Sequence, residues 1–224
     1  MGTSWRLGLV DSCGEHRGAL AATRFVRVGG AIQRAEPVVD ETGHGTRLAM
    51  ILAEEREDIA LILAQVFDPS GRTSADAVAA GIDWCLEVGV DLIHLSLGLR
   101  ADRASLARAV RRATDAGCLL VASVPARGGA PYPAAYPGVI RGTGDARCGF
   151  GELSRLDEMT FGACPTTGTD IGRGASVGAA HVTRELTRAM APNNLAAALV
   201  ALEARVKWRG PERRTAPLAL PAGD

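Results

Sequence analysis

The chain has 224 residues, of which 47% are hydrophobic, and its 25 basic residues balance its 25 acidic ones. This length is enough for one sizeable α/β core, and a formal net charge of zero gives no general attraction to nucleic acid. No run of about 18 apolar residues occurs, which argues against a membrane-spanning helix. We therefore expect neither nucleic acid nor a membrane as a partner.

The chain opens on a short polar start, and residues 5–10 then predict a buried strand that ends at Asp11. The first six residues, Met-Gly-Thr-Ser-Trp-Arg, lack the apolar core of a signal peptide, so we expect a cytoplasmic protein.

Beyond this strand the sequence alternates between strand and helix patterns. His44 opens a helix, since Leu48, Ile51 and Leu52 recur at helical spacing. Further strands are expected at 24–28, 58–66, 91–97, 118–123 and 138–141. Further helices are expected from a cap at 73–76 to about Gly89, at 105–116, from Ser176 through Met190, and at 193–206.

This alternation predicts an α/β fold: a doubly wound, mainly parallel sheet with helices on both faces. In such sheets, functional groups gather at the carboxyl ends of strands and at the starts of helices. We expect one compact domain over residues 1–207. Residues 208–224 are rich in Pro, Arg and Ala, and should form an extended or disordered tail.

Five cysteines, an odd number, are spread along the chain without a Cys-x-x-Cys pair. This pattern argues against both a disulfide framework and a zinc site, so we expect reduced thiols. His16, His94 and His181 are interpreted as surface, sheet-associated and helix-packing residues. We expect no catalytic metal and no cofactor.

An acid, an imidazole and a hydroxyl occur in one fixed order, as Asp11, His44 and Ser176. A serine hydroxyl needs a base within hydrogen-bond reach, and the base needs a buried carboxylate to hold its tautomer. Each residue alone is more often structural, as a strand end, a loop or a helix start. The three together, each in a suitable local setting, predict a catalytic triad.

The segments Leu9-Val-Asp11-Ser12, His44-Gly-Thr46 and Gly174-Ala-Ser-Val-Gly178-Ala-Ala-His-Val resemble motifs of the subtilisin-like serine proteases. Those motifs read Asp-(Ser/Thr)-Gly, His-Gly-Thr and Gly-Thr-Ser-Met-Ala-x-Pro-His-Val. The resemblance runs from about residue 6 to residue 190. It implies that Asp11, His44 and Ser176 are catalytic. Many secreted members carry a prodomain, for which we expect no room before Asp11.

The resemblance also implies a site for the substrate backbone. Leu95-Ser96-Leu97-Gly98 resembles the family's Ser-(Leu/Trp)-Gly strand, on which an extended peptide adds through main-chain hydrogen bonds. Gly98 is expected to leave space for that peptide. Leu95 and Leu97 can be core residues at the same time, because only their main chain is needed.

The oxyanion region departs from the family. The family's Val-Ala-Ala-Ala-Gly-Asn corresponds to residues 121–126, so Ala126 stands where the Asn side chain would donate to the oxyanion. The Ser176 N–H, at a helix N-terminus, remains available. Ser123 and Arg127 flank the gap and are candidate replacement donors. The resemblance implies an intact triad beside a degenerate oxyanion hole.

Three functions follow as hypotheses. The first is a slow serine endopeptidase of narrow specificity, a maturation protease that removes a leader. Its partner would be a peptide or small protein, presented by a modifying-enzyme complex. The second is an inactive pseudoprotease that binds peptides, and the third an acyl hydrolase that uses the same triad on an ester. The intact triad favours the first.

Overall fold

We describe a computed structural model of the chain, and the description covers residues 5–53, 56–167, 172–189 and 194–211. The strands are β1 (Trp5–Asp11), β2 (Ala21–Val28), β3 (Ala31–Ala35), β4 (Ile59–Gln65), β5 (Leu92–Leu95), β6 (Leu119–Ser123), β7 (Val139–Gly144), β8 (Leu153–Arg155), β9 (Thr160–Ala163) and β10 (Val206–Arg209). The helices are α1 (His44–Ala53), α2 (Ala75–Val88), α3 (Ala104–Asp115), α4 (Ala175–Ala189) and α5 (Leu195–Glu203).

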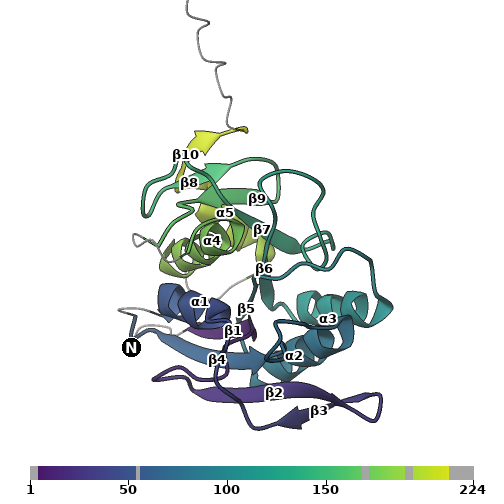
Figure 1. Ribbon diagram of the computed structural model, residues 1–224. Coiled ribbons are helices and arrows are strands. Elements are labelled where there is room, and N and C mark those ends of the chain that lie inside the picture. Colours follow the sequence, from purple (N-terminus) through teal and green to yellow (C-terminus); the bar gives the residue numbers. More distant parts are fainter. Residues whose placement is uncertain (1–4, 54–55, 168–171, 190–193, 212–224) are drawn as a thin grey trace, which may run out of the picture.

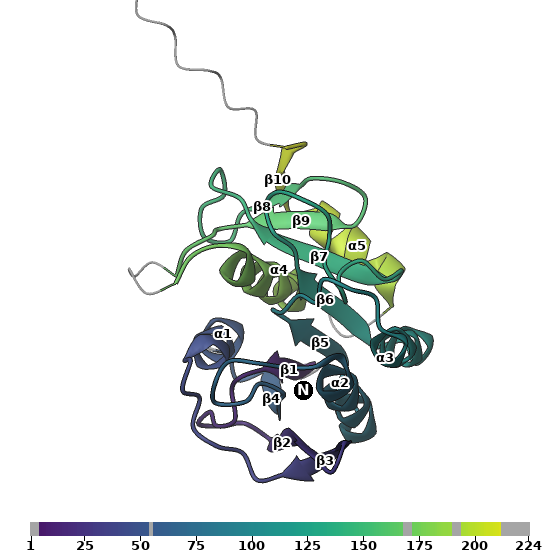
Figure 2. The ribbon, with the colours of Figure 1, turned by 45° about the vertical axis from the view of Figure 1, so that its right-hand side comes forward.

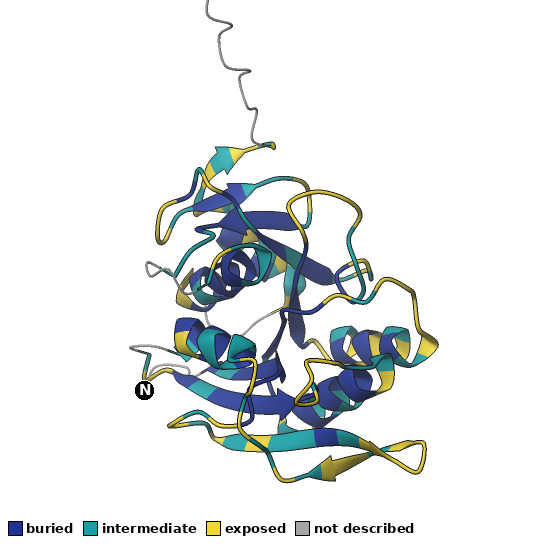
Figure 3. Cartoon of the chain, in the orientation of Figure 1, coloured by how far each residue is buried: buried dark blue, intermediate teal, exposed yellow. Residues whose placement is uncertain are grey.

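The strands form one sheet in the order β10-β8-β9-β7-β6-β5-β1-β4-β2-β3. All neighbours are parallel except two pairs, β2 with β3 and β8 with β9. The predicted doubly wound, mainly parallel fold is therefore confirmed. Because β5, β1 and β4 are mainly apolar and almost entirely buried, they lie at the centre, where both faces are covered (Figure 3).

The helices cover the two faces of the sheet (Figures 1 and 2). α2 and α3 pack on one face, where Val10, Ile62 and Ile93 belong to the same apolar cluster as Ile82 and Val110. α1, α4 and α5 pack on the other face through a second cluster of buried residues. Alternate residues of each central strand therefore bury themselves in two separate cores.

Glycines let α4 approach the sheet closely. A Cβ on Gly178 would lie 2.3 Å from the carbonyl oxygen of Thr143 in β7. A Cβ on Gly142 would likewise lie 2.6 Å from Cα of Ala179. Such contacts leave no room for a side chain, so these two glycines determine how near the start of α4 lies to the carboxyl end of β7.

Most of the expected elements are present, with differences at short strands. The sequence patterns missed β3, β8 and β9, which have three to five residues each. The expected helix at 193–206 was too long: α5 ends at Glu203, and Val206 begins β10. The expected domain end at residue 207 lies inside β10, which pairs with β8. Met190 and residues 212–224 lie outside the described residues.

All five cysteines are buried and free, in agreement with the expectation of reduced thiols. Burial raises the pKa of the Cys13 thiol to about 11, so this thiol stays protonated near neutral pH. Among the described residues, the helices are all too short or too polar to cross a membrane.

Candidate active site

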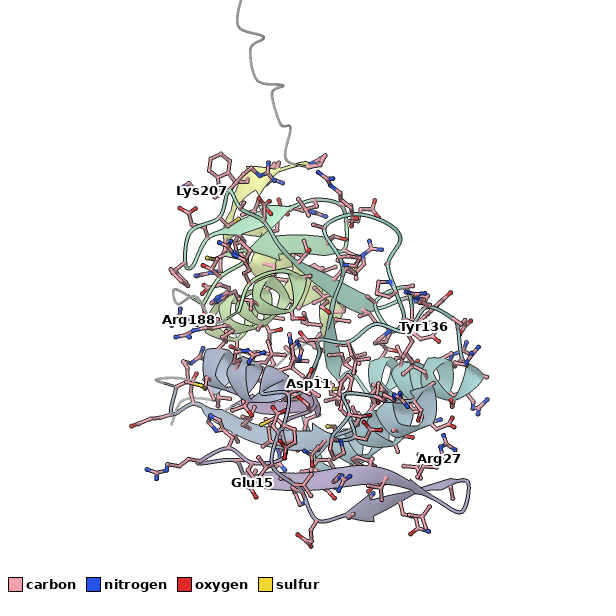
Figure 4. The ribbon with its side chains drawn as sticks, viewed as in Figure 1. Asp11, Glu15, Arg27, Tyr136, Arg188 and Lys207 are labelled. Carbon is pink, nitrogen blue, oxygen red and sulfur yellow. The ribbon has the colours of Figure 1, made fainter. Side chains whose placement is uncertain are left out.

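Asp11 and His44 form a buried hydrogen-bonded pair. Asp11 is the last residue of β1 and is fully buried, and its Oδ1 lies 2.7 Å from Nδ1 of His44. The same oxygen accepts the backbone N–H of Ser12 at 2.8 Å. Figure 4 shows Asp11 near the middle of the molecule, at the carboxyl end of its strand. The carboxylate thus holds one nitrogen of the imidazole and leaves Nε2 for another partner.

The start of α1 is held by side chains that cap it. Asp40 accepts the backbone N–H groups of Gly43 and Thr46, each at 2.9 Å, and also the Thr46 hydroxyl at 2.8 Å. The Ser12 hydroxyl accepts the Gly45 N–H at 2.9 Å. These bonds satisfy donors that the first turn of a helix leaves free. They therefore anchor the turn that carries His44.

The close approach of α1 to the end of β1 also depends on Gly45. A Cβ at this position would lie 2.3 Å from the backbone nitrogen of Cys13. The His-Gly pair of the sequence motif thus has a steric reason, since any side chain at position 45 would push His44 away from Asp11.

The pKa of His44 is raised above its ordinary value. The first cause is the hydrogen bond to Asp11, and the Coulombic attraction of the same carboxylate adds to it. Burial and the nearby Arg47 guanidinium oppose the rise. The side chain of His44 is 36% exposed, so one edge of the ring faces solvent.

Ser176 is the second residue of α4 and is half-buried. The Ser96 hydroxyl donates to its backbone carbonyl at 3.4 Å. In the register of β1 and β5, Leu9 pairs with His94. Two residues further, Asp11 is the last residue of β1, and Ser96 directly follows the end of β5. Neighbouring strands lie about 4.8 Å apart. The fold therefore brings the segments of Asp11, His44 and Ser176 to one place.

Within the described residues, the Ser176 hydroxyl and His44 make no hydrogen bond in this structure. Contacts of this type commonly close only when substrate is bound. The acid and base contact each other directly, whereas Ser176 is held nearby through its main chain.

A second histidine, His94, is linked to Ser176 through Ser96. His94 is fully buried; its Nδ1 lies 2.9 Å from the Thr183 hydroxyl and its Nε2 lies 2.8 Å from the Ser96 hydroxyl. Because Ser96 donates to the Ser176 carbonyl, it must accept from Nε2–H, and Thr183 must donate to Nδ1. Burial lowers the pKa of His94 to about 3, so this ring is neutral.

The expected substrate segment lies at the end of β5. Leu95, Ser96 and Leu97 are buried, and Gly98 is exposed. The space that Gly98 leaves is occupied by this chain itself, since a Cβ there would lie 2.8 Å from Cγ of Pro131. We expected the space that the missing side chain of Gly98 leaves to receive a peptide. That expectation is wrong, because Pro131, in the segment preceding Tyr132, fills this space.

The residues of the expected oxyanion region differ in how far they are buried. Ser123 ends β6 and is buried, whereas Ala126 and Arg127 are exposed in the loop that follows. Ala126 and Arg127 line a cavity of about 420 Å³ with Thr143 and Gly144 of β7. This cavity lies beside the nucleophile segment, since a Cβ on Gly144 would lie 2.9 Å from the carbonyl of Gly174.

The two remaining histidines, His16 and His181, lie in a loop and in α4. His181 is buried in α4, with Nε2 3.1 Å from the carbonyl of Thr166, and burial lowers its pKa. His16 is half-buried in the loop after β1. In the part of the chain that the structure describes, no group of three or more His, Cys, Asp and Glu side chains could hold a metal ion.

Sequence reasoning missed Asp40, Ser12 and Arg47. Asp40 had a readable signal, because an Asp a few residues before an expected helix start is a capping residue. Arg47 lies one helical turn after His44, on the same side of α1. The sequence predicts this spacing between Arg47 and His44, but it does not predict which residues surround Arg47.

Comparison with known proteins shows which protein family this chain is similar to. The sequence profile of the subtilase family matches residues 19–143, a range that includes His44 but neither Asp11 nor Ser176. The thermostable alkaline protease of Halalkalibacterium halodurans is 35% identical over 112 residues, which are 45% of this chain and 31% of that protein. Subtilisin Savinase of Lederbergia lenta is 32% identical over 123 residues, 50% of this chain and 46% of that protein.

Subtilisin DY of Bacillus licheniformis is 29% identical over 157 residues, 62% of this chain and 56% of that protein. The chain thus covers less than two thirds of the length of these relatives.

Proposed function

The chain belongs to the subtilase family, and from that premise we propose that it is a serine endopeptidase whose triad is Asp11, His44 and Ser176. The single observation that carries the proposal is the 2.7 Å contact between the buried Asp11 carboxylate and His44 Nδ1. The hydrogen bond from Ser96 to the carbonyl of Ser176, at the start of α4, supports it. The named relatives are proteases, which supports a peptide as substrate.

The chemistry follows from this geometry. Asp11 accepts a hydrogen bond from Nδ1–H of His44, so the proton of the neutral ring stays on Nδ1, and the unprotonated Nε2 can accept the Ser176 proton. The Ser176 oxygen then attacks the carbonyl carbon of the substrate, and His44 returns the proton to the departing amine. Water, deprotonated by the same imidazole, attacks the acyl-enzyme and releases the second product. Asp11 stabilises the imidazolium in both steps.

The oxyanion that forms in each step needs a hydrogen-bond donor. We propose the Ser176 N–H, because the first N–H groups of α4 have no partner within the helix and point along its positive end. Ala126 has no donor in its side chain. Ser123 and Arg127 are the candidate second donors, Ser123 from the end of β6 and Arg127 from the exposed loop.

A weak oxyanion hole suits an enzyme with one dedicated substrate. We propose a cytoplasmic maturation protease that removes a leader from a peptide or small protein, presented by a modifying-enzyme complex. In its altered oxyanion region, the chain resembles a small subtilisin-like protease that removes the leader of the crosslinked small subunit of quinohemoprotein amine dehydrogenase. Residues 95–98 would receive the substrate backbone.

A fluorophosphonate probe tests the enzyme directly, because it reacts only with an activated hydroxyl. We expect mass spectrometry to find the label on Ser176 of the purified full chain, and His44→Ala to abolish it. Ser70→Ala removes an exposed serine, in the loop after β4, whose hydroxyl bonds to Asp68, and is the matched control. Label on another residue, or labelling that survives His44→Ala, would refute the triad.

The second candidate is a pseudoprotease that binds peptides without cutting them. Ala126 and the lack of a Ser176–His44 hydrogen bond among the described contacts favour it. The two functions separate in one assay: a pseudoprotease binds peptide, yet it neither takes up the probe at Ser176 nor releases cleaved products.

A further inference from the structure

A groove lies between α1 and α4. It encloses about 600 Å³, and its walls include Arg47, Met50, Phe150, His181 and Arg188. Figure 4 shows Arg188 at the outer end of α4, above α1, and Asp11 further inside. The groove is therefore bounded by the two helices whose first turns carry His44 and Ser176.

One wall of the groove is apolar and accessible. Phe150 is 61% exposed and Met50 is 51% exposed, which is unusual for side chains of this size. Phe150 is held in place by an edge contact with His181, with ring centroids 5.6 Å apart. This wall can cover an apolar side chain of a bound segment.

Among the described residues that line the groove, positive charges outnumber negative ones. They are Arg47, Arg184 and Arg188, with one acidic residue, Glu185. Glu185 is buried and already forms ion pairs with Arg188 and with Arg205. Its charge is thus matched within the protein, and Arg184 donates to the Ile51 carbonyl at 3.1 Å. We therefore consider Arg47 as the arginine of the lining that pairs with a bound carboxylate.

Arg47 lies three residues after His44 on α1, and its charge acts on the His44 imidazole. It is half-buried, and within the described part of the chain its guanidinium forms no hydrogen bond and no ion pair. The guanidinium lies between two glycines: a Cβ on Gly43 would be 3.1 Å from Nη1, and a Cβ on Gly172 would be 3.7 Å from Nε. Gly43 directly precedes His44, and Gly172 lies four residues before Ser176. Arg47 therefore lies where the groove meets the candidate site.

We propose that this groove binds the leaving-group side of the peptide substrate and selects a segment that carries carboxylates next to an apolar residue. The direction of the substrate rests on the proposed function. If the part of the substrate that acylates Ser176 lies along residues 96–98, the part beyond the cleaved bond continues toward α1 and α4. A substrate carboxylate would pair with Arg47, whose planar guanidinium can bind both oxygens. The apolar residue would lie on Phe150 and Met50.

Binding to an inactive variant tests the groove without depending on catalysis. The probes are two fluorescein-labelled peptides, Ala-Ala-Ala-Glu-Phe-Glu-Ala and its Gln-Phe-Gln counterpart, titrated with full-length Ser176→Ala by fluorescence anisotropy. We expect the glutamate peptide to bind at least about tenfold more tightly, as one charge-assisted pair provides. In the double variant with Arg47→Glu, the preference should reverse.

Arg27→Gln in the Ser176→Ala protein is the matched control, because Arg27 is an exposed arginine on β2, far from Arg188 and Asp11 (Figure 4). It should keep the preference for glutamate. Equal binding of the two peptides, no binding of either, or a preference that survives Arg47→Glu would overturn the proposal. Probe labelling of Ser176 in the unmodified protein reports on the proposed function separately, so the failure of one is distinguishable from that of the other.

Discussion

The buried carboxylate of Asp11 and Nδ1 of His44 lie 2.7 Å apart, and two separate parts of the chain meet to form this contact. β1 ends at Asp11 in the centre of the sheet, and α1 starts at His44 under the caps of Asp40 and Ser12. Both residues of the pair are thus placed by backbone structure, which leaves the imidazole oriented before substrate arrives.

Replacement of Asp11 by Asn should reduce turnover by roughly 10⁴-fold, because an amide can donate to Nδ1 and so stabilise the wrong tautomer of His44. The measurement is the kcat for a cleaved peptide, with the rate of fluorophosphonate labelling beside it. Ser176→Ala and His44→Ala should be equally severe and should not add when combined, since the residues act as a unit. A fully additive double variant would contradict a shared triad.

Activity should rise with pH as His44 loses its proton, with a midpoint above the ordinary value of about 6.5 because Asp11 raises this pKa. The stability contributed by the charged pair has the opposite sign: it is present below the unfolded pKa and is lost as pH rises through the folded one. The pH profile of kcat/KM is the measurement. A rate that stays constant from pH 5 to 9 would exclude His44 as the base.

Protonation of His94 should destabilise the fold as pH falls. Burial lowers its folded pKa to about 3, so only the unfolded chain takes up a proton between pH 6.5 and 3. Stability from this group is therefore lost below about pH 6.5, by about 2 kcal/mol at pH 5. Urea unfolding at pH 5 and 7.5 measures it. His94→Gln should reduce this pH dependence, whereas His16→Gln, in the loop after β1, should keep it.

The oxyanion donors can be separated by kinetics. Loss of one such donor costs about 10²–10³ in rate in related sites. If Ser123 or Arg127 donates, Ser123→Ala or Arg127→Ala should lower kcat with little change in KM, since the interaction is made mainly in the transition state. Ala126→Asn should raise kcat if Pro125 lets the amide reach the oxyanion. An unchanged kcat in both alanine variants would leave the Ser176 N–H as the donor.

Removal of the Asp40 cap should weaken α1 and the placement of His44 together. Asp40→Ala should cost about 1 kcal/mol of stability, as loss of a helix cap does, and should lower kcat because the first turn carries the base. Thermal unfolding and kcat are measured on the same protein. Asp68→Ala, which removes a loop carboxylate that bonds only to its own turn, is the control and should leave kcat unchanged.

The sequence alone predicted the parts of the site that depend on local pattern. An apolar strand ending at Asp11, a helix opened at His44-Gly45 and a helix carrying Ser176 are all readable from periodicity and from glycine positions. The confirmed sheet class follows from the same alternation. Short strands such as β3, β8 and β9 escaped, because three to five residues are too few for a period to emerge.

Only the tertiary structure decided which distant residues touch. The path from Thr183 through His94 and Ser96 to the Ser176 carbonyl joins α4 to the end of β5, two segments about 80 residues apart in the chain, and no local pattern in the sequence predicts it. Likewise, Pro131 occupies the space beside Gly98, and Arg47 lines a groove built by residues of two helices and of loops. Hydrogen-bond partners, burial and the resulting pKa shifts depend on contacts between residues far apart in the chain. Periodicity determines which face of an element is buried, but it does not determine what lies against that face.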